Sequence, residues 1–457
     1  VNAISQSAYM NPGDPLTLER LMETAIRYQD LTAVNPQGNR LLVSNYFGGD
    51  HIVTETPWQW SKPYSYMIFH PGILLVDWNG SRELKRVLLE LGDGDLAHGR
   101  EDAQGLWTYP TEINWPDGTT RGGSSPQQTN LLMWAAWRWT GDARYLRPIE
   151  QVLRSGGAGA LAGVVTSDIP TALNRPELAE AWIAAASAPN AAPLALHGAW
   201  AATGDKTYLE RLYDGLRKDA QFRMPMMTED HWWVDRVEIP TMELQRQRLG
   251  GVALWRNAIV PGHLIGWRFD QDDDAEKLAV LVREPGPNGF RILAHNLSDA
   301  PIHAILTGAG GASRPSVVRE GNDRDGDRRA EIPASSSTID FGRDRTLDLK
   351  FASGVTTVID LKLDGPEIDI RTRPDLAIGL QGMRWRGDVL QVDIHSLGAI
   401  GTPAAQIQLV GANNEILAQA EAPSLEAPND LKPRVTTADL RGASGANTRG
   451  ARGRILS

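Results

Sequence analysis

The residue pattern of this chain changes at Asp270-Gln-Asp-Asp-Asp274, and that change restricts the possible folds more than any other feature. Before it, apolar residues recur at helical spacing between long loops. After it, short alternating segments rich in Val, Ile, Leu and Thr are separated by Gly, Pro, Asn and Asp. The sequence therefore predicts a multidomain α+β protein, with helices first and antiparallel strands second.

The helical half contains an internal repeat. Thr140-Gly-Asp142 and Thr203-Gly-Asp205 each follow an apolar stretch and precede a Tyr-Leu pair. In each copy the glycine ends one helix and the aspartate can cap the next. Helical hairpins of this length stack in α/α toroids and solenoids. We expect residues 1–270 to form an α/α toroid, with helices at 16–34, 81–92, 126–155 and 176–188.

A complete ring of six hairpins needs more helical residues than this half provides. We therefore expect either an open ring or an N-terminal portion that this sequence does not include. The chain starts at Val1 and not at Met, which is typical of a processed or trimmed product.

The second half divides into three segments. Residues 271–365 predict an antiparallel β-sandwich domain, and residues 366–425 predict an immunoglobulin-like β module. Residues 426–457 are polar and rich in Gly, Ser and Arg towards their end, which predicts a mobile tail. The strands are expected at 278–283, 290–295, 302–307, 338–341, 347–351, 356–363, 376–381, 389–395, 405–410 and 416–420.

Composition excludes several classes of function. The chain has no Cys, so it has no disulfides, thiolate zinc sites or cysteine nucleophiles. Its formal net charge of -10 argues against duplex nucleic acid as a partner. No apolar run approaches the roughly 20 residues that a membrane-spanning helix needs. The oligomeric state is not indicated by the sequence.

Every Trp and Tyr except Trp385 lies before residue 270. Many of them lie in loop-like stretches beside His, Asn, Gln and Arg, where flat rings suit the apolar face and hydroxyl edge of a sugar. The alternative is that a helical domain packs its core with Trp. That alternative poorly explains tryptophans among Pro, Gly and Asp. The predicted sugar platforms are Trp58, Trp60, Trp107 and Trp233.

The densest group of polar side chains runs from His231 to His263 and includes Arg236, Arg246 and Asn257. So many large polar groups beside Trp are costly to bury unless they are paired or face a ligand. Two interpretations stay open. The stretch either lines a binding site or forms an ion-pair network that links the helical half to the first β-sheet.

Parts of the same stretch resemble a known enzyme family. Asp235-Arg-Val-Glu-Ile-Pro240 and Leu244-Gln-Arg-Gln-Arg-Leu-Gly-Gly-Val-Ala-Leu-Trp-Arg-Asn257 resemble the join between helical and β domains in the L-rhamnose-α-1,4-D-glucuronate lyases, polysaccharide lyase family twenty-seven. A second block, Tyr28 to Arg40 followed by Asn45-Tyr-Phe47, is also similar. The resemblance covers roughly residues 25 to 365, but it does not identify catalytic positions.

The module from Asp375 resembles adhesion-type immunoglobulin-like domains of secreted bacterial proteins. The two resemblances together imply a secreted, periplasmic or cell-surface lyase. Its partner would be an acidic polysaccharide or oligosaccharide, and no cofactor is expected.

The lyase resemblance implies β-elimination at a uronic acid, which yields a 4,5-unsaturated uronate. Such a reaction needs Arg, His, Asn or Gln to neutralise the carboxylate, and a Tyr or His to remove the C5 proton. The predicted acid or base residues are His197, Tyr46, His51, His231 and Tyr109. The predicted substrate-binding residues, besides the four platforms, are Arg236, Arg246, Asn114, Arg121 and Asn257.

His197 takes the place in its repeat that Trp134 holds in the other copy, which favours a specialised role. The alternative is an ordinary core or capping histidine. A glycoside hydrolase on the same scaffold would instead need two carboxylates about 5 to 9.5 Å apart. The residues that could supply such a pair are Asp235, Glu238, Glu243, Glu112 and Asp117. A non-catalytic carbohydrate-binding or adhesion protein is the third hypothesis.

No catalytic metal is expected. Asp323-Arg-Asp-Gly-Asp327 resembles part of a calcium loop because its carboxylates alternate, but it lacks the rest of an EF-hand. A solvated turn is therefore favoured over structural calcium. Gly156-Gly-Ala-Gly-Ala160 follows a helix and lacks the Lys-Ser/Thr of a phosphate loop, so we interpret it as a linker.

Overall fold

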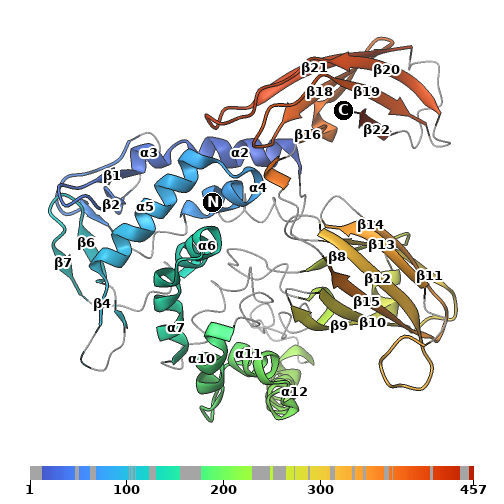
Figure 1. The fold of residues 1–457 in the computed structure, drawn as a ribbon, viewed down its shortest axis with the longest axis horizontal. Helices are drawn as coiled ribbons and strands as arrows, with labels where there is room; N and C mark the ends of the chain where they lie inside the picture. The colour runs from blue at the N-terminus through green and yellow to red at the C-terminus, as the bar shows by residue number, and fades with distance from the viewer. Residues whose placement is uncertain are drawn as a thin grey trace. The chain divides into compact units, whose positions relative to one another are not determined.

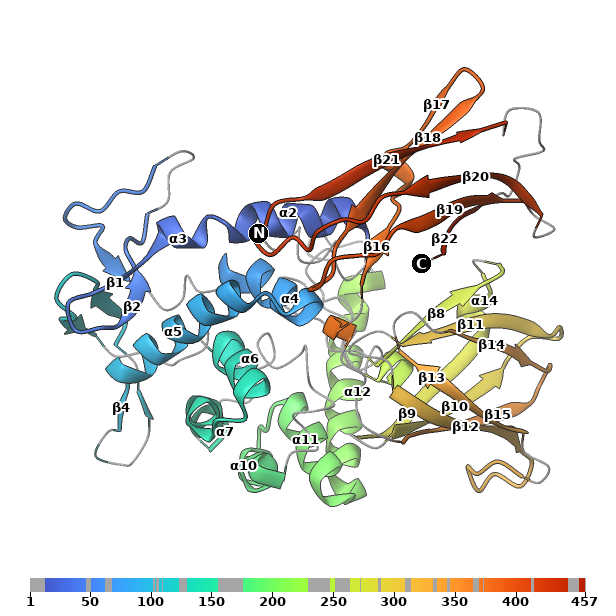
Figure 2. The same cartoon turned by 45° about the horizontal axis from the view of Figure 1, so that its top comes forward.

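The protein contains both helices and antiparallel sheets (Figure 1, Figure 2), which confirms the predicted α+β class. By internal contacts it divides into two compact units. The first unit consists of residues 1–99, 110–123 and 369–457, and the second of residues 100–109 and 124–368. This division differs from the predicted consecutive domains, because each unit combines segments that are distant in sequence. The computed structural model describes residues 13–46, 51–61, 68–101, 103, 107–108, 110–122, 130–154, 176–228, 247–250, 264–271, 273–286, 289–308, 314–331, 335–342, 346–364, 370–372, 374–411, 415–442 and 452–456.

The N-terminal part of the first unit packs helices against short strands. Helix α2 is capped by Asp14, whose Oδ2 accepts a hydrogen bond from the Thr17 N–H at 2.9 Å. It buries Leu18, Leu21 and Met22. The elements of this part are α2 (Pro15–Ala25), α3 (Tyr28–Leu31), β1 (Thr32–Val34), β2 (Arg40–Leu42), β3 (Trp60–Ser61), α4 (His70–Asn79), α5 (Arg82–His98), β6 (Glu112–Asn114) and β7 (Thr120–Arg121).

The predicted helix at 16–34 is interrupted between α2 and α3 and was wrong at its end, where Thr32–Val34 form β1. The chain leaves the helix after Ala25, and β1 pairs with β2 as an antiparallel hairpin. Asn35 stabilises the turn, because its Oδ1 accepts hydrogen bonds from the N–H groups of Gln37 and Asn39. β-branched residues followed by Asn-Pro and a glycine favour a strand and a turn over a helix.

The C-terminal β module forms two sheets with a common core. One sheet contains β16, β17, β18 and β21, and the other has the strand order β20-β19-β22. The core includes Leu390, Ile394, Ile407 and Leu440. The strands are β16 (Leu376–Ala377), β17 (Met383–Arg386), β18 (Val389–Ser396), β19 (Ala405–Val410), β20 (Ile416–Ala422), β21 (Arg434–Arg441) and β22 (Arg452–Leu456), and two 3-10 turns are η5 (Ile370–Thr372) and η6 (Leu380–Gly382).

The prediction of a mobile tail at 426–457 was wrong for its strands. β21 pairs with β18 from Val389↔Arg441 to Ser396↔Arg434, and β22 pairs with β19. The sheet supplies the partners for a segment whose own sequence is mostly polar.

The C-terminal module contacts the N-terminal helices within the first unit. His395 Nδ1 on β18 lies 2.6 Å from Glu19 Oε1 on α2, and both side chains are largely buried. Trp78 Nε1 on α4 donates a hydrogen bond to Asp375 Oδ2 at 3.0 Å. These contacts join residues 297 and 376 positions apart, so the first unit is built from both terminal segments of the chain.

His70, at the start of α4, is fully buried in the first unit. Neither ring nitrogen has a hydrogen-bond partner among the residues that the structure describes. Burial lowers the pKa of His70 from 6.5 to about 3, because the charged form loses its hydration. The folded protein therefore holds this imidazole neutral.

Replacing His70 by Leu should make the protein less sensitive to acid. Because the pKa is depressed by folding, the stability that His70 contributes is complete above its unfolded pKa of 6.5 and is lost as pH falls towards about 3. Between about pH 7.5 and about pH 5, we expect the melting temperature to fall less for His70→Leu than for the wild type. Circular dichroism melts measure this. The control is His51→Leu, at an exposed histidine, whose melting temperature should change with pH as in the wild type. If the melting temperatures of all three proteins fell equally with pH, buried His70 would not be the cause of the acid sensitivity.

The second unit begins with helices that follow one another in space. α6 packs on α7, α7 on α10, α10 on α11 and α11 on α12. These helices and their neighbours are β4 (Arg100–Glu101), β5 (Trp107–Thr108), α6 (Asn130–Thr140), η2 (Ala143–Leu146), α7 (Arg147–Arg154), α10 (Pro176–Ala186), α11 (Pro193–Thr203) and α12 (Lys206–Thr228).

The predicted repeat is confirmed at its helix ends. Gly141 and Gly204 have φ of 73° and 71°, a left-handed conformation that ends α6 and α11. Asp142 Oδ1 accepts a hydrogen bond from the Arg144 N–H, and Asp205 Oδ1 accepts one from the residue two positions later in its own copy, both at 2.9 Å. The predicted single helix at 126–155 is therefore broken at Gly141 into α6, η2 and α7.

Two antiparallel sheets form the rest of the second unit. One has the strand order β13-β12-β15-β10-β9 and the other β14-β11-β8. Both contribute to one core, which includes Ile292 and Val318 from the first and Ala304 and Leu306 from the second. The elements are β8 (Ile265–Phe269), α14 (Asp274–Lys277), β9 (Leu278–Gly286), β10 (Gly289–Asn296), β11 (Ile302–Gly308), β12 (Arg314–Asp323), β13 (Ser335–Phe341), β14 (Thr346–Phe351) and β15 (Thr356–Leu363).

These strands could be predicted from the sequence because apolar and polar residues alternate along them. Buried and partly exposed residues alternate along the whole of β10 and β11. The structure adds β8, which begins before the predicted boundary at 271, and β12, which lies between two predicted strands.

Candidate functional site

A small antiparallel sheet in the first unit brings several predicted site residues together. Its strand order is β3-β6-β7. Trp60 pairs with Asn114, and Glu112 pairs with Arg121. Cross-strand partners and alternate residues of a strand lie on the same face of a sheet. Trp60, Glu112, Asn114 and Arg121 therefore share one face.

Arg121 is held between an aromatic ring and a carboxylate. Its guanidinium carbon lies 3.9 Å from the centroid of the Trp60 ring, which is a cation–π contact. Its Nε forms an ion pair with Glu112 Oε2. The Glu112 side chain is 10% exposed, whereas that of Arg121 is 52% exposed. Glu112 and Trp60 thus orient a guanidinium that remains open to solvent.

A second aromatic pair lies next to this sheet in the chain. The rings of Tyr46 and Trp58 are tilted at 45°, with centroids 5.1 Å apart. The backbone N–H of Asn45 donates to the Trp58 carbonyl at 3.0 Å, which fixes the two segments together. Tyr46 and Trp58 are 48% and 40% exposed. We call Tyr46, Trp58, Trp60 and Arg121 the aromatic–arginine cluster.

Two buried polar atoms lie at the ends of strands β3 and β6, on residues outside the predicted site. Gln59 Oε1 and Trp115 Nε1 have no hydrogen-bond partner in the described part of the chain. The two residues are neighbours, because the Trp115 N–H donates to the Gln59 carbonyl at 3.2 Å. Buried polar atoms of this kind normally bind water or a ligand. The turn sequence Trp115-Pro-Asp-Gly118 was the available signal.

The two carboxylates near this sheet, Glu112 and Asp117, are each engaged by neighbouring groups. Glu112 is engaged by Arg121. Hydrogen bonds from Thr119, first from its side chain and then from its backbone, lower the pKa of Asp117. A carboxylic acid with a lowered pKa is a poor general acid near neutral pH. The other hydrolase candidates, Asp235, Glu238 and Glu243, lie outside the described residues.

His197 lies in the second unit, on α11, and the aromatic–arginine cluster lies in the first. Its ring is tilted against Trp200, with centroids 5.3 Å apart. Trp134 and Trp137 form the corresponding pair in the other repeat copy, with centroids 4.8 Å apart. Trp134 is buried, so the core-packing interpretation holds for that tryptophan.

The remaining predicted site residues lie outside the sheet of β3, β6 and β7, and most lie outside the described part of the chain. His51 is described and exposed, and Trp107 contributes backbone to β5 while its side chain lies outside the described part. The predicted residues outside the described ranges are His231, Tyr109, Arg236, Arg246, Trp233 and Asn257.

The acidic loop after β12 gathers carboxylates within a small space. Single ligand atoms of Asp323, Asp325 and Asp327 lie within 4.8 Å of one another. Asp323 Oδ1 accepts a hydrogen bond from the Gly326 N–H at 2.9 Å, and Asp325 Oδ1 accepts one from the Asp327 N–H at 3.0 Å. These bonds account for the turn by themselves, so structural calcium remains the less favoured prediction.

None of the helices in the described part of the chain is long and apolar enough to cross a membrane.

Comparison of the chain with protein-family models, curated proteins and solved structures gave no match.

Proposed function

We propose that this protein is a polysaccharide lyase that cleaves a uronic-acid-containing glycan by β-elimination. The linkage is rhamnose-α-1,4-glucuronate, and the product carries a 4,5-unsaturated uronate. In this proposal the helices of residues 1–270 belong to an α/α toroid, complete or open. Residues 271–365 form a β-sandwich, and the C-terminal strands form an immunoglobulin-like module.

The observation that carries the proposal is the aromatic–arginine cluster. The partly exposed Trp60 ring lies against the half-exposed Arg121 guanidinium, and Tyr46 and Trp58 form an exposed ring pair close to Trp60 in the chain. Together they offer apolar surface for a pyranose and a cation for its carboxylate. An aromatic core would bury these rings, as it buries Trp134. Asn114, which pairs with Trp60 across the sheet, adds an amide donor next to the cluster.

Each part of the reaction has a candidate in this region. Arg121 neutralises the charge of the uronate carboxylate and Asn114 donates a hydrogen bond to it, which makes the C5 proton more acidic. Glu112 and Trp60 hold Arg121 in place. Tyr46 is the base that the cluster itself supplies, and the same phenol returns the proton to the departing glycosidic oxygen. His51, in the same unit, is a second candidate, and His197 is a candidate in the other unit.

The two alternative functions, a glycoside hydrolase and a non-catalytic carbohydrate-binding protein, require different residues. A hydrolase needs a carboxylic acid that stays protonated, and the lowered pKa of Asp117 argues against its use as that acid. A non-catalytic binding protein would use the same rings without a base. Both remain outcomes of the experiment below.

Incubation with glycans that contain rhamnose-glucuronate linkages should raise the ultraviolet absorbance of a conjugated 4,5-unsaturated uronate. Replacing Arg121 by Gln should lower kcat/KM by about 10²–10³, because a preorganised donor to the developing negative charge is lost. Initial rates from absorbance, with circular dichroism to check folding, measure the effect.

Arg144→Gln is the matched control. Arg144 is also an exposed arginine, paired with Asp142 and 5.8 Å from the Tyr145 ring, but it lies in the repeat turn. It should retain wild-type turnover. New reducing ends without absorbance would indicate a hydrolase, and binding without either would indicate a receptor. Equal loss in both variants would contradict a specific role for Arg121.

A further inference from the structure

The exposed face of the five-stranded sheet in the second unit carries a row of charged residues. Arg291 on β10 pairs with Asp360 on β15, and Asp360 pairs with Arg319 on β12. Register partners lie on the same face of a sheet. Two arginines therefore flank one aspartate across three neighbouring strands.

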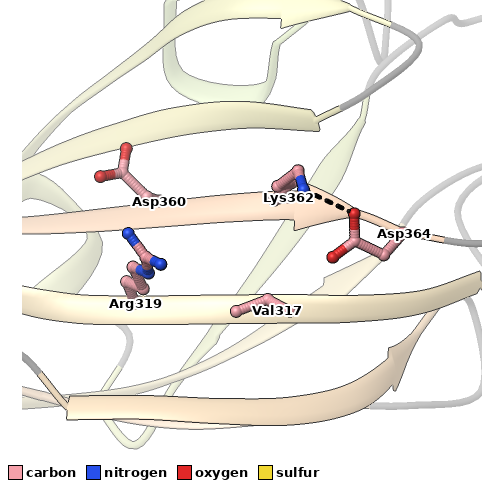
Figure 3. Close-up of a pocket in the computed structure, with 5 residues that line it drawn as sticks. All are labelled: Val317, Arg319, Asp360, Lys362 and Asp364. Carbon is pink, nitrogen blue, oxygen red and sulfur yellow. Dashed lines mark ion pairs between the residues drawn. The ribbon is translucent and has the colours of Figure 1, made fainter.

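A pocket of about 300 Å³ opens beside this row (Figure 3). Figure 3 shows the Arg319 guanidinium extending from β12 towards Asp360, with Lys362 and Asp364 turned towards each other at the end of β15. Val317 lies next to Arg319 on the same strand face and supplies an apolar wall. The volume is sufficient for one sugar ring or a molecule of similar size.

Some of the charged side chains in and beside the pocket form ion pairs, and one does not. Arg291 Nε binds Asp360 Oδ1 at 2.5 Å, and Lys362 Nζ lies 2.9 Å from Asp364 Oδ1. Arg319 is exposed and forms no ion pair with any residue in the described ranges. The guanidinium of Arg319 is therefore available to pair with a carboxylate of a ligand.

We propose that this pocket binds a hexuronate, with Arg319 gripping the carboxylate through both of its terminal nitrogens. A planar guanidinium matches a carboxylate in this geometry, and a lysine does not. Asp360 and Asp364 accept hydrogen bonds from sugar hydroxyls, and Val317 contacts the carbon-bound hydrogens of the ring. The same two aspartates repel a doubly charged sulfate or phosphate, which selects a singly charged, hydroxyl-rich ligand.

This pocket and the aromatic–arginine cluster are formed by different residues, which belong to different compact units. The proposal for the pocket does not depend on the lyase proposal. A protein without lyase activity can still bind a uronate here, and a lyase can lack this site.

The test is isothermal titration calorimetry of the full chain in an Arg121→Gln background, which removes binding at the cluster. Sodium D-glucuronate is the probe, with D-glucose and sodium sulfate as comparison ligands. We expect glucuronate to bind more tightly than either. Arg319→Gln should weaken glucuronate binding by about tenfold or more, because a charge-assisted pair of hydrogen bonds is lost. Arg319→Lys should also weaken it, since it keeps the charge and loses the fork.

Arg268→Gln is the matched control, an exposed arginine on β8 of the other sheet in the same unit. It should leave the affinity unchanged. The proposal is overturned if glucuronate does not bind, if glucose or sulfate binds as tightly, or if Arg319→Gln retains the parent affinity. If Arg319→Lys kept the full affinity for glucuronate, the proposed bidentate binding by both terminal nitrogens of Arg319 would be wrong.

Discussion

Replacing Trp134 by Ala should lower the free energy of unfolding by about 3–5 kcal/mol, because a fully buried indole leaves a cavity that the helices cannot close. Trp134 is 1% exposed, and its ring packs 4.8 Å from that of Trp137. Replacing Trp58, which is 40% exposed, should cost about 1 kcal/mol or less, chiefly the contact with Tyr46. Urea unfolding followed by far-ultraviolet circular dichroism measures both changes.

The same pair of variants separates core tryptophans from sugar platforms. Trp58→Ala should weaken glycan binding while the protein stays folded, and Trp134→Ala should lose stability first. Similar destabilisation in both variants would mean that Trp58 is a packing residue. The proposed platform would then lose one of its rings.

Gly94→Ala should destabilise the first unit by about 1–3 kcal/mol, because the added methyl group has no space. A Cβ at Gly94, on α5, would lie 2.3 Å from the Arg40 carbonyl oxygen on β2. The obstacle is backbone, so β2 must move away from α5. That movement also disturbs the ion pair of Arg40 Nε with Glu90 Oε2, which are 2.7 Å apart. Thermal and urea unfolding report the loss.

Gly215→Ala provides the opposite control in another helix. Nothing lies within 4 Å of a Cβ built at Gly215 on α12. Alanine there should raise stability by about 0.5–1 kcal/mol, because glycine costs more conformational entropy in a helix interior. If both glycine variants behaved alike, helix propensity and not the α5–β2 contact would govern position 94.

The strands were predictable where alternation and apolar content coincide. β10 and β11 alternate between core and surface along their whole length, and each was expected. β21 was not, because only Ala438 and Leu440 of its eight residues face the core. Its strand conformation depends on pairing with β18, a partner that the local sequence does not specify.

The sequence could predict which types of residue form the candidate site, but not which of them are in contact. Residue type and loop context suggested Trp58, Trp60 and Arg121 as separate candidates. The β3-β6-β7 register places Arg121 over the Trp60 ring and gives it Glu112 as a partner. Pairing register between distant segments is a long-range property, since a shift by one residue would move every side chain to the opposite face.

The sequence by itself determined the α+β class, most strand positions and the repeated Thr-Gly-Asp helix ends, because these follow from local periodicity and from the left-handed conformation that glycine adopts easily. Only the tertiary structure decided that the two ends of the chain share one compact unit, through contacts such as His395 with Glu19. It also decided which aromatic rings are buried and which are exposed. Burial depends on what packs against a ring, and those neighbours come from segments that the local sequence cannot identify.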